Sequence, residues 1–233
     1  MRYRLTKSKF IMGLQCEKAL YLDIYKPQLA FHSQETLARF RKGRHFESKI
    51  KSMFPGGIDI SMELRGAVQR YPELTARMLC EPGAVTLFEA GFQYNEVLVL
   101  ADVVQKAVDG TIKIFEIKNS QTIKEVIRHD VCLQHYVIGN SLPQLSEKSD
   151  KALVLKSFDI IYNDGNDQPL YEELLSEAKA AEPLIARQVA HFKEMLQGME
   201  PNVTTGSQCH MPYECPYQRY CKGKTTAQTD LSF

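Results

Sequence analysis

The sequence predicts an α/β fold in which helices flank a mixed central β-sheet. Three consecutive segments are rich in β-branched and aromatic residues, and they span residues 84–94, 96–106 and 111–118. The turn pairs Tyr94-Asn95 and Asp109-Gly110 join these segments, which is typical of an antiparallel meander. Segments with helical periodicity lie on both sides of the meander, and this order favours a sheet with helices packed against it.

The remaining elements follow from periodicity and from the positions of proline and glycine. In the second helix Phe46, Ile50 and Met53 recur on one face, and Pro55 with two following glycines ends it. The first helix carries Cys16. The predicted helices span residues 8–24, 35–54, 72–80, 121–139 and 170–197, and a fourth strand spans 151–162.

The composition is that of an ordinary globular chain without an overall charge signal. Its 233 residues are 44% hydrophobic and 24% charged, and the formal net charge is +1, so any nucleic-acid surface must be local. No segment approaches the roughly 18 apolar residues of a membrane span, and the N-terminus lacks the apolar stretch of a signal peptide. We therefore expect a cytoplasmic protein with no membrane partner. In that reducing compartment, six cysteines indicate metal or redox chemistry rather than disulfides.

Two neighbouring predicted strands each carry an acid where a hydrophobic residue is expected. The second strand, VLVLADVV, is apolar on both faces and should be buried, yet it contains Asp102. In the third strand Glu116 and Lys118 point to one face, because side chains two apart do so in a strand. Buried carboxylates need a cationic partner or a metal ion.

Two interpretations of these charges are open. In the first, Asp102 and Lys118 form a buried salt bridge and Glu116 lies at a solvated strand end. In the second, Asp102 and Glu116 bind a divalent cation through hard oxygen ligands while Lys118 stabilises charge on a phosphate. The second arrangement suits hydrolysis of a phosphodiester.

The spacing of these residues resembles the signature of the PD-(D/E)XK nuclease superfamily. Asp102 is followed on the next predicted strand by Glu116-Ile117-Lys118 and then by a helix. The resemblance implies a restriction-endonuclease-like core in which both acids bind Mg²⁺ or Mn²⁺. It implies that Lys118 activates water or stabilises the transition state. Gln134, in the apolar stripe of the following helix, matches a glutamine that RecB-like members place beside the metal.

The RecB-like resemblance adds further candidates. His45 matches a histidine that contributes to the metal site from a helix ahead of the sheet, and His129 and His135 fit this position less well. Tyr136 matches a tyrosine that follows the glutamine, although the commoner pattern places it about one turn later. Glu89, in the first strand of the meander, is a possible additional metal ligand.

A group of cysteines near the C-terminus is the second chemical signal. Cys209, Cys215 and Cys221 are separated by equal gaps, a spacing that fits neither the local rule for zinc nor that for ferredoxin-type clusters. The set resembles the iron–sulfur ligands of RecB-like nucleases of the AddB and CRISPR-associated types, where one N-terminal cysteine joins three near the C-terminus. The resemblance makes Cys16 the fourth ligand of a structural cluster, expected to be 4Fe–4S.

Two simpler interpretations of the cysteines stay open. The first is a zinc site completed by His210 or Cys16. The second is a set of unligated surface thiols, which is less favoured because exposed thiols are reactive. Cys80 and Cys132 are expected to be small buried apolar residues.

A basic segment accompanies the second predicted helix. Its cations are Arg39, Arg41, Lys42, Arg44, Lys49 and Lys51, with Lys7 and Lys9 upstream. Clustered cations bind phosphates through counterion release, although a run of charges is often only a solvated helix face. The candidate nucleic-acid contacts are Arg41, Lys42, Arg44, Lys49 and Tyr136.

These observations lead to one expected function and two alternatives. The expected organisation is a nuclease core at 1–205, a cluster-binding segment at 206–225 and a tail at 226–233. As the resemblance implies, we expect a Mg²⁺- or Mn²⁺-dependent exonuclease on single-stranded DNA, in recombination, repair or CRISPR-related processing, with nuclease or helicase subunits of unknown identity as partners. The alternatives are a protein of the same fold that binds nucleic acid without cutting it, and a structural zinc protein whose strand charges form salt bridges.

Overall fold

The computed structural model describes the backbone of residues 5–223 and the side chains of that range except those of residues 34–42. The chain divides into two compact units. Unit 1 comprises residues 1–7 and 39–187, and unit 2 comprises residues 8–38 and 188–233. Unit 2 therefore extends well beyond the cysteine-rich segment expected at 206–225, since it draws on both ends of the chain.

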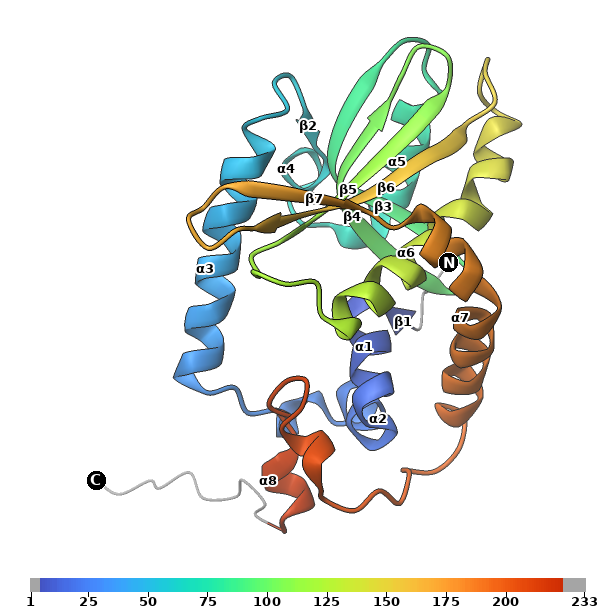
Figure 1. The fold of residues 1–233 in the computed structure, drawn as a ribbon. Helices are drawn as coiled ribbons and strands as arrows, with labels where there is room; N and C mark the ends of the chain where they lie inside the picture. Colours follow the sequence, from blue (N-terminus) through green and yellow to red (C-terminus); the bar gives the residue numbers. More distant parts are fainter. Residues whose placement is uncertain (1–4, 224–233) are drawn as a thin grey trace. The chain divides into compact units, whose positions relative to one another are not determined.

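Within the described residues, unit 1 contains a seven-stranded sheet in the order β2-β3-β4-β5-β6-β7, with β1 paired to β4 (Figure 1). The strands are β1 (Leu5–Thr6), β2 (Ile58–Asp59), β3 (Val85–Tyr94), β4 (Val97–Lys106), β5 (Thr111–Lys118), β6 (Val154–Asn163) and β7 (Pro169–Glu173). Strands β3, β4 and β5 form the expected antiparallel meander, while β5 and β6 are parallel. The predicted α/β class with a mixed central sheet is confirmed.

The two turns of the meander have the geometry that their residues favour. Asn95 and Glu96 have φ angles of 47° and 61°, as in the tight hairpin turns whose twist matches that of the flanking strands. At the second turn Gly110 has a φ of 88°, and the carboxylate of Asp109 accepts a hydrogen bond from the backbone N–H of Thr111 at 2.9 Å. Both turns hold the three strands in register.

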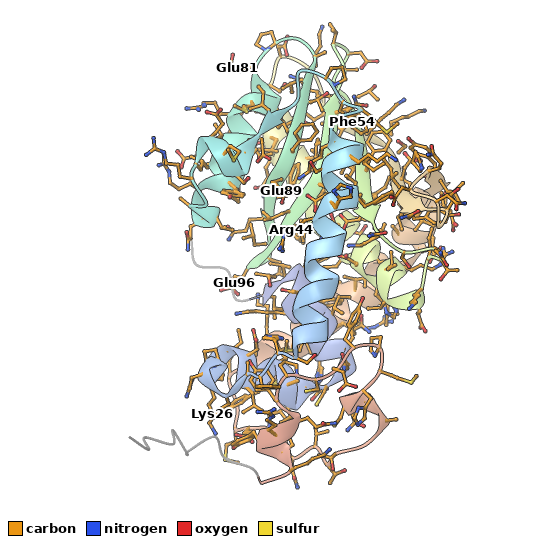
Figure 2. The ribbon with its side chains drawn as sticks, turned by 90° about the vertical axis from the view of Figure 1, so that its left-hand side faces the viewer. Lys26, Arg44, Phe54, Glu81, Glu89 and Glu96 are labelled. Carbon is orange, nitrogen blue, oxygen red and sulfur yellow. The ribbon has the colours of Figure 1, made fainter. Side chains whose placement is uncertain are left out.

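Helices cover both faces of this sheet. On one face, Phe46 and Ile50 of α3 (Gln34–Lys51) pack against Val103 and Ile117; Figure 2 shows α3 lying in front of the strands. Side chains adjacent along a strand point to opposite faces, so Glu116 points to the other face, where α6 (Glu125–Ser146) packs against β3, β4 and β6. The remaining helices of unit 1 are α4 (Ile60–Glu63), α5 (Tyr71–Cys80) and most of α7 (Leu175–Met195).

Lys106 ties the end of β4 to the end of α5. Its side chain is buried, and its ammonium group donates a 2.9 Å hydrogen bond to the carbonyl of Leu79 and another to the carbonyl of Glu81. The last carbonyls of a helix have no partner within the helix. Lys106 therefore satisfies groups that burial would otherwise leave unpaired.

Unit 2 is assembled from segments that are far apart in the sequence. Its elements are most of α1 (Lys7–Gln15), α2 (Glu17–Tyr25), the end of α7, α8 (Gln218–Cys221) and short 3-10 turns at Pro27–Leu29 and Ser207–Cys209. The rings of Phe10 and Phe192 meet edge to face at 5.5 Å. Tyr217 is fully buried, and its hydroxyl donates to Asp23 at 2.9 Å.

Several expected boundaries are wrong. The helix expected at 8–24 is broken at Cys16, whose extended backbone (φ −164°) separates α1 from α2. The helix expected at 170–197 starts at Leu175, because the preceding residues Pro169–Glu173 pair with β6 as strand β7. Helix α6 runs on to Ser146 instead of ending at residue 139. Over the part of the chain that the structure describes, no helix combines the length and apolar character needed to cross a bilayer.

Candidate active site

Strands β4 and β5 separate at the two acids that the sequence singled out. Their ladder ends with Val103 opposite Phe115, and one further step of this register places Asp102 opposite Glu116. At that step the backbone N–H of Ile117 donates to the Asp102 carboxylate at 2.7 Å. Opposed residues on paired strands point to the same face, so both carboxylates point to the face that carries α6.

Glu116 is the centre of a group of buried polar side chains. Its side chain is fully buried, and its Oε1 accepts hydrogen bonds from Lys7 at 2.8 Å and from Lys118. Its Oε2 accepts a 2.8 Å hydrogen bond from Nε2 of Gln134 on α6. The interpretation with Glu116 at a solvated strand end is therefore wrong, and Lys118 pairs with Glu116 rather than with Asp102.

Sequence reasoning missed two members of this group, Asp130 and Lys7. Asp130 lies on α6 one turn before Gln134, is buried, and accepts a 2.8 Å hydrogen bond from Lys118 and a 3.3 Å one from Gln134. The i,i+4 spacing of the two residues, which places them on one helix face, could have revealed Asp130. No local pattern singles out Lys7. We call Asp102, Glu116, Asp130, Lys7, Lys118 and Gln134 the acid cluster.

The two strand carboxylates have opposite pKa shifts. Burial, with added repulsion from Glu116, raises the pKa of Asp102 to about 8. Burial alone would also raise the pKa of Glu116, but the adjacent ammonium groups of Lys118 and Lys7 lower it to about 2. At neutral pH Glu116 is therefore ionised while Asp102 is largely protonated.

The ammonium groups of the acid cluster are held in the charged form. Burial lowers the pKa of Lys118, but Asp130 and Glu116 outweigh this effect and raise it well above its ordinary value. The pKa of Lys7 is raised for the same reason. At neutral pH two ammonium groups therefore lie beside the ionised carboxylate of Glu116.

The donor set fits a divalent cation such as Mg²⁺ or Mn²⁺. Asp102 and Glu116 supply hard carboxylate oxygens. Gln134 directs its amide nitrogen to Glu116 and Asp130, and its Oε1 is buried without a hydrogen-bond partner. Such an orphaned oxygen indicates a missing donor or cation. Among the side chains of residues 5–33 and 43–223, no three His, Cys, Asp or Glu groups already converge on one ion position.

Glu89 lies on the other side of β4 in an unusual backbone conformation. Phe88 pairs with Val103 and Ala90 with Ala101, so Glu89 lies across from Asp102. Its φ of 52° is rare for a residue with a side chain and costs about 1–3 kcal/mol. Its carboxylate accepts a 2.6 Å hydrogen bond from Lys51 of α3, and Figure 2 shows Glu89 beside that helix.

Two candidates lie apart from the acid cluster. His45 is an exposed residue of α3, the helix that covers the opposite face of the sheet from Glu116. Tyr136 is buried on α6, where its hydroxyl accepts a 3.0 Å hydrogen bond from Asn95 and its ring meets Tyr94 edge to face. The ring of Tyr136 is thus committed to the interior of unit 1, and we leave it out of the nucleic-acid surface.

The basic segment is only partly exposed for binding. Arg44 and Lys49 are exposed on α3, and Figure 2 shows Arg44 on that helix. Lys51 is engaged by Glu47 and Glu89 through hydrogen bonds of 2.6 Å each. The side chains of Arg41 and Lys42 lie outside the described ones.

The four cysteines named by the sequence surround one cavity in unit 2. Cys16, Cys209, Cys215 and Cys221 all line it, together with backbone and side chains of residues 203–205. His210 is not among the lining residues; its ring nitrogens contact Glu214 and Gln218 instead. The fourth thiol of the group is therefore Cys16, which the break between α1 and α2 presents to the cavity.

Two thiols of the cavity, those of Cys215 and Cys221, have raised pKa values that favour the protonated form. Burial raises the pKa of Cys215 to about 11, and the neighbouring thiols add to the effect. Burial likewise raises the pKa of Cys221. Thiols in this state become thiolates when a metal supplies the compensating positive charge.

No protein-family model and no curated protein matches the chain. The acid cluster and the cysteine cavity are therefore the two features of the chain that indicate a function.

Proposed function

We propose that the protein is a metal-dependent nuclease with a restriction-endonuclease-like core, hydrolysing DNA phosphodiester bonds. The observation that carries the proposal is the acid cluster: carboxylates from two strands that part beside each other, a lysine two residues after the second, and a buried glutamine oxygen without a partner. These are the residue types that metal-assisted phosphodiester hydrolysis needs.

Each residue has a defined part in the proposed reaction. Asp102 and Glu116 would hold the divalent ion, and Asp102 would release its proton on binding it. A bound Mg²⁺ or Mn²⁺ supplies a nucleophile by lowering the pKa of its water and neutralises charge on the phosphate. Lys118, held between Glu116 and Asp130, would place its ammonium group at the scissile phosphate. The unpaired Oε1 of Gln134 would accept a hydrogen bond from the attacking water.

For the cysteine cavity we propose an iron–sulfur cluster of the 4Fe–4S type. Four thiols around one cavity match the four-cysteine ligand set of such clusters. Its role would be structural, because it would close a loop from Cys16 to Cys209 and so join the two ends of unit 2. The alternative occupant of the cavity is a zinc ion, which the same thiols would bind.

The proposed substrate is single-stranded DNA with an accessible end. The exposed cations Arg44 and Lys49 would contact backbone phosphates, which makes binding weaker as salt increases. These cations support contact with the DNA backbone, and the preference for strand ends rests on the resemblance noted above.

The test is digestion of end-labelled single- and double-stranded DNA by protein purified without oxygen, with Mn²⁺ or Mg²⁺. We expect cleavage by the natural protein and its loss in Glu116→Gln and in Lys118→Met, by at least about a hundredfold if both act on the transition state. Lys113→Met is the matched control, since Lys113 is an exposed residue of the same strand. Equal inactivity of the natural protein and both variants would contradict the proposal.

One observation favours a second candidate, a protein that binds nucleic acid without cutting it. Both oxygens of Glu116 already have donors from the protein itself, so the acid cluster can balance its charge internally. In that case DNA binding would be retained while Mn²⁺ and Mg²⁺ produced no cleavage. A gel-shift assay beside the digestion separates the two functions.

The cluster has its own test, independent of activity. We expect protein purified without oxygen to contain iron and acid-labile sulfide and to absorb visible light, and we expect Cys215→Ser to lose all three. Cys132→Ser is the control, because Cys132 is a buried residue of α6 in unit 1. Zinc in place of iron in anaerobic protein would reject the cluster and leave the acid cluster untouched.

A further inference from the structure

The N-terminal strand delivers a second lysine to the acid cluster. β1 pairs in parallel with the start of β4, with Leu5 opposite Val97 and Thr6 opposite Leu98. Strand β5 pairs with β4 only from Val103 onward, so β1 occupies the edge of β4 that β5 has left. Leu5 is fully buried and fixes β1 in place. Lys7, two residues later, extends its side chain into the space where β4 and β5 separate.

Lys7 lies between two carboxylates at unequal distances. Its ammonium nitrogen is 2.8 Å from Oε1 of Glu116 and 3.8 Å from Oδ2 of Asp130. The ammonium group of Lys118 contacts the same two oxygens, with a distance of 2.8 Å to Asp130. Two ammonium groups therefore share one oxygen of Glu116, the carboxylate that the proposed function assigns to the metal ion.

A divalent ion and two ammonium groups cannot share this oxygen without strong repulsion, because like charges at contact distance in a buried site are poorly screened. Lys118 is fixed by its 2.8 Å contact with Asp130. Lys7 is the group that can move, because its ammonium nitrogen is still 3.8 Å from Asp130 and needs to shift by only about one ångström to reach hydrogen-bond distance of that second carboxylate.

We propose that Lys7 is a positioning residue that competes with the divalent ion for Glu116 and transfers to Asp130 when the ion binds. This inference rests on the proposed function, because it assumes that Glu116 is a metal ligand. In the proposed transfer, Asp130 receives the ammonium group of Lys7, so that this group still has a carboxylate partner after it leaves Glu116. The affinity for metal is then set partly by the N-terminal strand.

The experiment measures Mn²⁺ affinity of the full chain without nucleic acid, by titration followed with electron paramagnetic resonance. We expect Lys7→Met to bind Mn²⁺ about tenfold more tightly than the natural protein. Lys7→Arg keeps the positive charge and should bind Mn²⁺ no more tightly than the natural protein. Lys113→Met controls for loss of an exposed positive charge elsewhere on the sheet. Equal or weaker Mn²⁺ binding by Lys7→Met would overturn the inference.

A double-mutant cycle tests the part assigned to Asp130. Asp130→Asn should weaken Mn²⁺ binding, and it should do so less in the Lys7→Met background, because there is then no ammonium group to relocate. Equal effects of Asp130→Asn in both backgrounds would refute the transfer.

The controls also separate this inference from the proposed function. Loss of Mn²⁺ binding in Glu116→Gln, together with no effect of Lys7→Met, would reject only the inference about Lys7. If the natural protein bound no Mn²⁺, or bound it equally well in Glu116→Gln, the proposed function and the inference would both fail. Circular dichroism of each variant shows whether an altered affinity comes with an intact fold.

Discussion

Replacing Asp102 with asparagine should change how the stability of the fold depends on pH. Asp102 has a pKa of about 8 in the folded chain against an ordinary value of 3.8, chiefly because it is buried. A carboxyl group with a raised pKa holds its proton more tightly when folded. Its contribution to stability is therefore present at low pH and is lost as the pH rises through that interval.

The size of the effect follows from proton linkage. Between about pH 5 and pH 7 the folded chain holds close to one proton on Asp102 that the unfolded chain does not. Each pH unit then removes about 1.4 kcal/mol of stability, or about 2–3 kcal/mol over the interval. Glu116 adds little slope here, because its pKa is lowered to about 2 in the folded chain and an unfolded glutamate is already mostly ionised at about pH 5. The same residue is present in both proteins compared below.

Urea unfolding followed by circular dichroism, in buffers without divalent ions, measures this difference. The free energy of unfolding of Asp102→Asn relative to the natural protein should rise by about 2–3 kcal/mol from about pH 5 to about pH 7. Groups that titrate in both chains, such as His135, cancel in the comparison. Asp109→Asn is the control, since Asp109 lies in an exposed turn with a lowered pKa. A difference that stays constant, or falls with pH, would refute the reasoning.

Three further predictions concern the packing of unit 1, and urea unfolding measures each of them. Lys106→Met should lose about 1–3 kcal/mol of stability, because the carbonyl of the buried residue Leu79 at the end of α5 loses its donor; an unchanged stability would contradict this. Gly91→Ala should lose about 1–3 kcal/mol, since its new Cβ would lie 2.6 Å from Cβ of Tyr71. Gly43→Ala should instead gain up to about 1 kcal/mol, because a Cβ at this position of α3 meets nothing within 4 Å, and a loss there would reject the argument.

Local patterns in the sequence were enough to predict the meander and its class of fold. Alternating apolar residues and the turns at Asn95 and Gly110 specify β3, β4 and β5 almost to the residue. Strand β7 was missed because its five residues have no apolar alternation of their own and are held by pairing with β6. The break at Cys16 was missed because α1 and α2 have one continuous helical composition, and only contacts within unit 2 separate them.

The acid cluster was predictable to the extent that its residues lie on adjacent elements of the core. Glu116 and Lys118 share a strand face, and Gln134 is a polar residue in an apolar helix stripe, so each is visible in the sequence. Lys7 is 109 residues away from Glu116 in the chain, and a pairing over that distance has no local signal. The backbone conformation of Glu89 has no local signal either. Its positive φ accompanies the irregular pairing of β3 with β4 at this residue, which the sequence of β3 alone does not reveal.

The composition of unit 2 has a consequence for how the protein is made. Gln15 donates hydrogen bonds to the carbonyls of Gln208 and Tyr213, at 2.6 Å and 2.7 Å, so the first helix finds these partners only after residues 208–213 have been synthesised. Unit 1 draws on no residue beyond 187 and can fold on the ribosome, since domains generally form as their chain emerges. Phe10 contacts Phe192, and Cys16 lines a cavity with Cys209, Cys215 and Cys221. The N-terminal segment therefore lacks these partners while unit 1 forms, and we expect it to be prone to aggregation during that time.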